Sequence, residues 1–204
     1  MADPCIEIIA VAHQRLGELR VFVQSILNQT STNWKLNVIH DGEDADFIST
    51  MEPFASQAPN QIEYSCTPQR YNDYGHSLRT IGLHAAKGDF ILLTNADNYY
   101  IPRFIEFITE AVIDVQPDIV IYDMIHSHAN PGTRQQPAYS FFPTRYAVND
   151  IDMGAAVIRR DLAQQAGFVD NSYAADAVFF EDVVMIKKDE TRICKINRVM
   201  LVHN

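Results

Sequence analysis

The sequence predicts an α/β fold in which a mainly parallel central sheet is flanked by helices. Residues 6–12 form an apolar, β-branched run that is typical of a central strand. From Glu18 to Leu27, apolar side chains recur every three or four residues, which is the spacing of a helix with one buried face. Residues 34–39 form a second apolar run. Strand, helix and strand at this spacing indicate a right-handed crossover between parallel strands.

The best-marked strand of the chain ends in a cluster of polar side chains. Residues 90–93 are four apolar residues between a glycine and this cluster, so we expect them to form a buried strand. The polar cluster consists of Thr94, Asn95, Asp97 and Asn98. Pro102 suits the first turn of a following helix. Open α/β sheets bind ligands at the carboxyl ends of their strands, which places the functional site around Asp97.

The remaining elements follow from apolar spacing and from glycine and proline boundaries. Further strands are expected at residues 62–66, 118–122, 153–159 and 193–204. Further helices are expected at residues 47–54, 77–86, 102–112, 161–166 and 174–188. Residues 129–142 contain proline, glycine and glutamine and are expected to form a loop. These elements predict a single domain over residues 1–204, with one half before and one half after about residue 122.

Composition places the chain among globular proteins that do not bind nucleic acid. It has 204 residues, of which 47% are hydrophobic, enough to bury about 70% of its unfolded surface. The net charge of −10 argues against a nucleic-acid or anionic-membrane partner, because both require clustered Lys and Arg. Three widely spaced cysteines predict neither a disulfide nor a zinc site. Because no transmembrane segment or signal peptide is recognisable, a soluble, cytoplasmic protein is expected.

Several motifs, taken in order, make the chain resemble the family 2 glycosyltransferases. These motifs are the strand end at 38–42, the Gly- and Arg-bearing segment at 75–90, Asn95-Ala96-Asp97, the turn at 167–170 and the late histidine His203. Together they cover nearly the whole chain. The resemblance implies the GT-A fold with a Rossmann-like sheet, a donor-binding half over residues 1–122 and a smaller acceptor-binding half over residues 123–204.

The resemblance implies that the donor is a UDP-sugar. Asp41 would bind the uracil or the ribose, and Ala12 and His13 at the end of the first strand would flank the base. Arg79 would lie near the diphosphate or hold the following acidic loop in place.

The resemblance also implies a metal site. Asn95, Ala96 and Asp97 stand where the family has its Asp-x-Asp motif, and Asn95 replaces the first acid without supplying its negative charge. Asp97 and His203 would be the protein ligands, leaving other positions open for phosphate. Oxygen and imidazole ligands suit Mn²⁺ and tolerate Mg²⁺.

An inverting transfer needs a carboxylate that removes the proton of the acceptor hydroxyl. The predicted helix at 174–188 carries two candidates, Asp176 and Asp182. Asp176 is favoured because the start of a helix faces a cleft, whereas the Glu181-Asp182 doublet better matches the usual acidic pair of the family. Spacing does not decide between them.

The expected function is transfer of a hexose from a UDP-sugar to a hydroxyl of a glycan or another acceptor, with inversion and with a metal ion. A non-catalytic binder of sugar nucleotides or glycans is an alternative, because Asn95 weakens the metal motif. A sugar nucleotidyltransferase ranks lower, since the loop at 13–17 has only one Arg and one Gly. The short chain is expected to act as a minimal enzyme, as a homo-oligomer or beside additional transferase domains.

Overall fold

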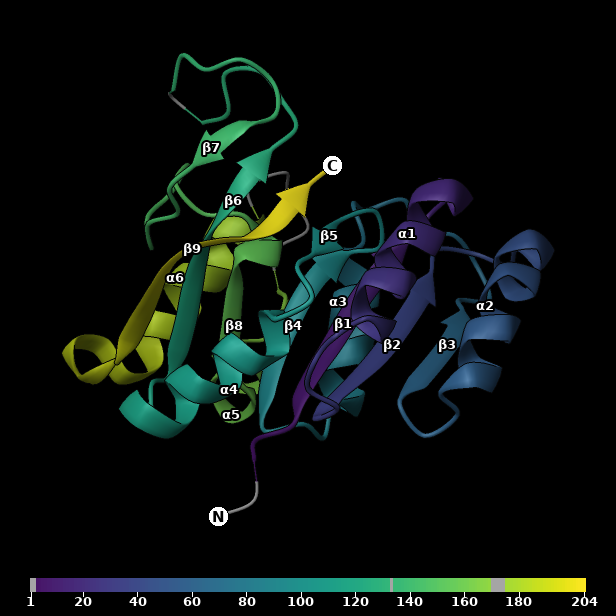
Figure 1. The fold of residues 1–204 in the computed structure, drawn as a ribbon, viewed down its shortest axis with the longest axis horizontal. Helices are drawn as coiled ribbons and strands as arrows, with labels where there is room; N and C mark the ends of the chain where they lie inside the picture. Colours follow the sequence, from purple (N-terminus) through teal and green to yellow (C-terminus); the bar gives the residue numbers. More distant parts are fainter. Residues whose placement is uncertain (1–2, 133, 170–174) are drawn as a thin grey trace.

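The computed structural model describes residues 3–132, 134–169 and 175–204, which form one sheet covered by helices (Figure 1). The strands are β1 (Ile6–Ala12), β2 (Trp34–His40), β3 (Ile62–Cys66), β4 (Phe90–Asn95), β5 (Tyr99–Tyr100), β6 (Ile119–His126), β7 (Ser140–Phe142), β8 (Ala156–Arg159) and β9 (Ile193–His203). The helices are α1 (Leu16–Leu27), α2 (Ala45–Gln57), α3 (His76–Ala85), α4 (Phe104–Val115), α5 (Arg160–Ala166) and α6 (Ala175–Lys187), with the 3₁₀ turns η1 (Met153–Ala155) and η2 (Lys188–Glu190).

The predicted α/β fold with a mainly parallel sheet is confirmed. The strand order is β3-β2-β1-β4-β8-β6-β9-β5, with β7 added to β6. The first four strands pair in parallel, so their carboxyl ends meet at one edge of the sheet. Val11 lies opposite Ile39 on β2 and opposite Asn95 on β4, which makes the three strand ends level. The loops after β1, β2 and β4 therefore surround one point.

The second half of the chain extends the sheet and returns to the loop after β4. Strand β8 lies antiparallel between β4 and β6, and β9 runs parallel to β6. The short strand β5 pairs antiparallel with β9, with Tyr99 opposite Val202. Figure 1 shows the yellow end of β9 next to β5. This pairing places the last residues of the chain beside the loop that carries Asp97.

Apolar side chains fill both faces of the sheet. Alternate residues of β1 enter different clusters, because successive side chains of a strand point to opposite faces. Ile8 belongs to the cluster formed with α1, α2 and α4, and Ile9 belongs to the cluster formed with α3, α5 and α6. Strands of parallel sheets are covered on both faces, so both sets of side chains are buried. This explains the continuous apolar run of β1.

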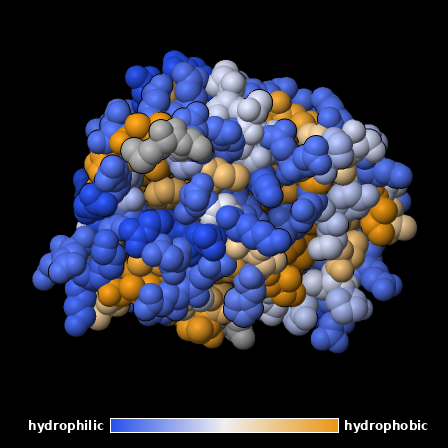
Figure 2. Space-filling view, turned by 90° about the horizontal axis from the view of Figure 1, so that it is seen from below, coloured by the Kyte–Doolittle hydropathy of each residue, from blue (hydrophilic) through white to orange (hydrophobic). Residues whose placement is uncertain are grey.

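The outer surface is predominantly hydrophilic on the face at the amino ends of the parallel strands. Figure 2 shows this face, on which apolar side chains form separate patches divided by hydrophilic ones. Among the helices that the structure describes, none combines the length and apolarity needed to cross a bilayer. Cys5, Cys66 and Cys194 are free thiols.

The structure differs from the predicted elements in the length of α2 and in the presence of β7. Helix α2 is longer than the predicted helix at 47–54, since the Asp44 side chain caps it by accepting a 2.9 Å hydrogen bond from the backbone N–H of Phe47. The predicted loop at 129–142 contains β7, which pairs with β6.

The predicted strand at 153–159 is a strand only in its second part. Its first residues form η1, because the carboxylate of Asp152 accepts a 2.9 Å hydrogen bond from the backbone N–H of Gly154. Strand β6 continues past Tyr122 to His126, so the expected division of the chain near residue 122 lies within a strand. Asp170 of the predicted turn and Ala174 of the predicted helix are outside the described residues.

Asp118 is a fully buried carboxylate at the start of β6. It accepts hydrogen bonds from Arg159 at 2.6 Å, from Lys187 at 2.9 Å and from the backbone N–H of Arg192 at 2.9 Å. Burial alone raises the pKa of Asp118, but these hydrogen bonds and the two charges outweigh it and keep the pKa below its usual value. Asp118 thereby ties β8, α6 and the segment before β9 to β6.

We expect Asp118→Ala to lower the free energy of unfolding by about 2 to 3 kcal/mol in urea titrations at pH 7, because two cations lose their buried partner. Since folding lowers the pKa of Asp118, its contribution is present above the unfolded-state pKa of about 4 and is lost as the pH falls through the folded-state pKa. Asp161→Ala is the control, because it removes an exposed partner of the same Arg159 and should cost less than about 1 kcal/mol. Equal losses in the two variants would contradict this account.

Candidate active site

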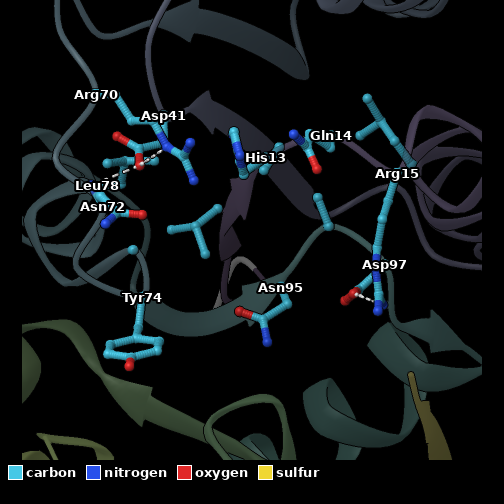
Figure 3. A pocket seen from close by; sticks show the side chains of 15 residues that line it. His13, Gln14, Arg15, Asp41, Arg70, Asn72, Tyr74, Leu78, Asn95 and Asp97 are labelled. Atoms are coloured by element: carbon cyan, nitrogen blue, oxygen red, sulfur yellow. Dashed lines mark hydrogen bonds and ion pairs between the residues drawn. The ribbon is translucent and has the colours of Figure 1, made fainter. Parts of the chain in front are cut away.

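A pocket of about 380 Å³ opens at the carboxyl ends of β1, β2 and β4 (Figure 3). It is lined by residues that the sequence analysis places in the donor site, namely Ala12, His13, Asp41, Asn95, Ala96 and Asp97. The level strand ends bring these residues together, although they are far apart in the sequence. Arg15, Arg70 and Tyr74 also line the pocket.

Asp41 fixes one wall of the pocket. Its buried carboxylate accepts hydrogen bonds from the backbone N–H groups of Tyr71 at 2.7 Å and Asn72 at 3.0 Å. Burial and the charge of Arg70 lower the pKa of His13, which favours a neutral imidazole on this wall. Each carboxylate oxygen has a second lone pair, so Asp41 retains acceptor capacity for a ligand.

Asp97 lies between β4 and β5, at the opposite side of the pocket from Asp41 (Figure 3). Its Oδ2 accepts a 2.8 Å hydrogen bond from Arg15. Its Oδ1 is buried and has no hydrogen-bond partner within the described residues. Buried carboxylate oxygens normally have a partner, so this oxygen is suited to bind a further ligand such as a cation.

Arg79 is buried behind the pocket and is not among its lining residues. It donates hydrogen bonds to the side-chain oxygen of Asn95 at 2.7 Å and to the backbone carbonyl of Tyr74 at 2.8 Å. Its guanidinium also lies over the ring of Phe168, 5.6 Å from the ring centre. These contacts connect α3 to the end of β4, directly before the loop that carries Asp97.

Asp176 lies in the first turn of α6, where it interacts electrostatically with Arg79, His76 and Asp152. Burial raises the pKa of Asp176, the charges of Arg79 and His76 oppose this rise, and the charge of Asp152 adds to it, so that the pKa is above its usual value. Asp182 is six positions later on the same helix. At 3.6 residues per turn it points about 120° away from Asp176 around the helix axis.

His203 is the last residue of β9 and its side chain is largely buried. Its Nε2 lies 3.5 Å from Oδ2 of Asp152, and its Nδ1 lies 3.3 Å from Oγ of Ser127. The ring stacks on His126 with 4.4 Å between ring centres. Burial and the charge of His203 lower the pKa of His126 to about 4, so His126 is neutral at pH 7.

The two predicted metal ligands lie on neighbouring segments. Asn204, which follows His203, donates from its side chain to the backbone carbonyl of Asp97 at 2.7 Å and from its backbone N–H to the side-chain oxygen of Asn98 at 3.1 Å. In the described ranges, no group of three or more His, Cys, Asp and Glu residues is arranged to hold a metal by itself. A cation here would need ligands from the substrate as well.

Comparison with known proteins assigns the chain to a family. The sequence profile of glycosyl transferase family 2 matches residues 7–164, which is more than half of the chain. The chain belongs to this family. Among curated proteins, no sequence matches this family 2 member significantly.

Solved structures show that this family 2 member has the GT-A fold. Residues 1–349 of S. aureus TarS superimpose with a TM-score of 0.78 at 14% identity, over 98% of this chain and 60% of the TarS chain. The UDP-GlcNAc complex of the same TarS fragment gives 0.78 at 16% identity, over 97% and 58% of the two chains. The Pyrobaculum calidifontis mannosyltransferase PcManGT, in complex with GDP-Man and Mn²⁺, gives 0.73 at 13% identity, over 99% and 57%. This chain therefore spans about three fifths of these structures.

Arg15 at the pocket and Asp152 beside His203 are among the residues that the sequence alone does not identify in this family 2 member. Arg15 stands two positions after His13, and its place in the loop after β1 is the signal that could have identified it. Asp152 carries no such signal, because it reaches the site only through the turn η1 and the neighbouring end of β9.

We expect Asp152→Asn to lower the pKa of Asp176, because the negative charge of Asp152 contributes to raising it. Titration of the Asp176 carboxyl carbon by NMR measures this pKa, and its midpoint should move to lower pH in the variant. Asp150→Asn is the matched control, since Asp150 precedes Asp152 by two residues but pairs with Arg134. An unchanged midpoint in Asp152→Asn would show that the two carboxylates are not coupled.

Proposed function

We propose that the chain transfers a hexose from a UDP-sugar to an acceptor hydroxyl, with inversion at the anomeric carbon. The observation that carries this proposal is the pocket at the ends of β1, β2 and β4, where polar residues from three strands meet. Residues before about 122 would bind the donor, and residues after about 122 would bind the acceptor. Because the chain spans about three fifths of the structures it resembles, additional domains of a larger transferase fit this proposal.

The size and polarity of the pocket support a nucleoside diphosphate donor. Its volume of about 380 Å³ lies within the range of small-molecule sites. Asp41 offers acceptor oxygens to the base or ribose on one side (Figure 3). On the other side, Arg15 offers positive charge to the diphosphate, and Asp97 offers a carboxylate to a cation. The TarS complexes with UDP and UDP-GlcNAc favour uridine as the base, and the GDP-Man complex of PcManGT makes guanosine the comparison to test.

Asp97 and His203 would hold the Mn²⁺ or Mg²⁺ ion that we include in this proposal. Oδ1 of Asp97, for which the described part of the chain supplies no hydrogen-bond partner, and the adjacent end of β9 fit that role. A bound cation neutralises the negative charge that develops on a departing diphosphate. The structure of PcManGT with GDP-Man and Mn²⁺ supports the choice of ion.

Asp176 would act as the general base. It accepts the proton of the acceptor hydroxyl while that oxygen attacks the anomeric carbon on the face opposite the diphosphate. As the new carbon–oxygen bond forms, the bond to the diphosphate oxygen breaks and its electron pair leaves with UDP. A pKa above the usual value makes Asp176 a stronger proton acceptor than an ordinary carboxylate. Asp182 lacks this placement, because it points elsewhere on α6.

A non-catalytic sugar-nucleotide binder is the second candidate. Asn95 supplies no charge in the metal motif, and Arg15 already pairs with Asp97. Both features reduce the negative charge available to a cation. A binder of this kind would hold a UDP-sugar and leave it intact.

We expect Asp176→Asn to lower UDP release from UDP-hexoses, assayed with Mn²⁺ and a panel of glycan acceptors, by about 100-fold or more. UDP affinity measured by calorimetry should stay within about twofold, because Asp176 does not line the donor pocket. Asp182→Asn is the matched variant on the same helix and should remain active.

An active Asp176→Asn protein would contradict the assignment of the base. A wild-type chain that binds UDP-sugars but turns none of them over would favour the non-catalytic binder.

A further inference from the structure

Two arginines line the pocket from opposite sides. Arg15 pairs with Asp97 on one side, and Arg70 lies beside Asp41 on the other, with 3.8 Å between Arg70 Nε and Asp41 Oδ2. Figure 3 shows the two arginines on opposite sides of the pocket, with His13 between them. The pocket thus contains its own positive charges, in a chain whose net charge is −10.

The backbone of the loop after β1 determines where Arg15 lies. Gln14 and Arg15 both adopt left-handed conformations, with φ values of 57° and 50°. Non-glycine residues in this region each cost roughly 1 kcal/mol or more, so neighbouring structure must hold them there. The loop directs Arg15 to Asp97, yet 58% of the Arg15 side chain remains exposed. The guanidinium has five N–H donors and its bond to Asp97 uses one, which leaves donors for a ligand in the pocket.

The carboxylate of Asp97 is the point where Arg15 and a metal ion would meet. Oδ2 accepts the hydrogen bond from Arg15, and Oδ1 is buried without a partner in the described ranges. A guanidinium and a divalent cation on one carboxylate repel each other at this short distance. Asn95 adds no negative charge that would offset the repulsion. Binding of a cation to Asp97 must therefore weaken the pairing with Arg15, and the pairing must weaken cation binding to the same extent.

We propose that Arg15 binds the diphosphate of the donor and competes with the divalent cation for Asp97. The proposal rests on the proposed function and adds to it a residue that neutralises the diphosphate. A guanidinium suits this role, because its planar fork matches phosphate oxygens and its charge is permanent. Nucleoside diphosphates should consequently bind this chain even when divalent cations are chelated.

The test compares wild type, Arg15→Gln and Arg103→Gln by calorimetry in two separate titrations. Arg103 is the matched control, because it is 53% exposed and pairs with Glu106, but it does not line the pocket. The first titration adds UDP in the presence of EDTA. We expect wild type and Arg103→Gln to bind UDP, and Arg15→Gln to bind it about tenfold more weakly, since a charged hydrogen bond to phosphate is lost.

The second titration adds Mn²⁺ alone, without nucleotide. Arg15→Gln should bind Mn²⁺ several-fold more tightly than wild type, because the competing charge is gone. Equal Mn²⁺ affinities in the two proteins, or equal UDP affinities in EDTA, would overturn the role of Arg15 while leaving the donor site intact. A wild-type chain that binds neither UDP nor GDP, with or without Mn²⁺, would overturn the proposed function and the role of Arg15 together.

Discussion

The site depends on one buried positive charge, the guanidinium of Arg79. A buried cation destabilises a fold by several kcal/mol unless neighbouring groups satisfy it. Arg79 is 3% exposed, and its partners are Asn95, the Tyr74 carbonyl and the ring of Phe168. These partners come from the end of β4, the turn before α3 and the segment after α5. Satisfying one charge therefore fixes the relative positions of three segments around the pocket.

Three acids from both halves of the chain offset the charge of Arg79. Asn95 accepts a hydrogen bond from Arg79 but carries no charge, whereas Asp176, Asp152 and Asp73 are nearby acids that favour its protonated form. Asp152 also lies 3.5 Å from His203. These charges offset the buried guanidinium beside Asn95, and this explains physically how the site accommodates an asparagine at position 95.

Local sequence patterns were sufficient to predict the parallel strands. The place of the pocket could also be predicted, since the ends of parallel strands must meet at one edge of the sheet. That rule placed the site around Asp97, and the resemblance to the family added Asp41 to it. The contribution of Asp152 could not be derived, because it depends on a capped turn and on the two-residue pairing of β5 with β9. The choice between Asp176 and Asp182 also stayed open in the sequence, because both acids lie on one predicted helix and their spacing to His203 does not decide between them.

The central claim is that the pocket at the ends of β1, β2 and β4 binds the nucleoside diphosphate. Mapping backbone amide chemical shifts of the ¹⁵N-labelled chain during a UDP titration tests this claim most directly. The account predicts saturable shifts concentrated at residues 12–15, 70–72 and 95–97, which surround the pocket. Shifts concentrated instead at β7 and the end of β6, or no saturable shift at all, would contradict it.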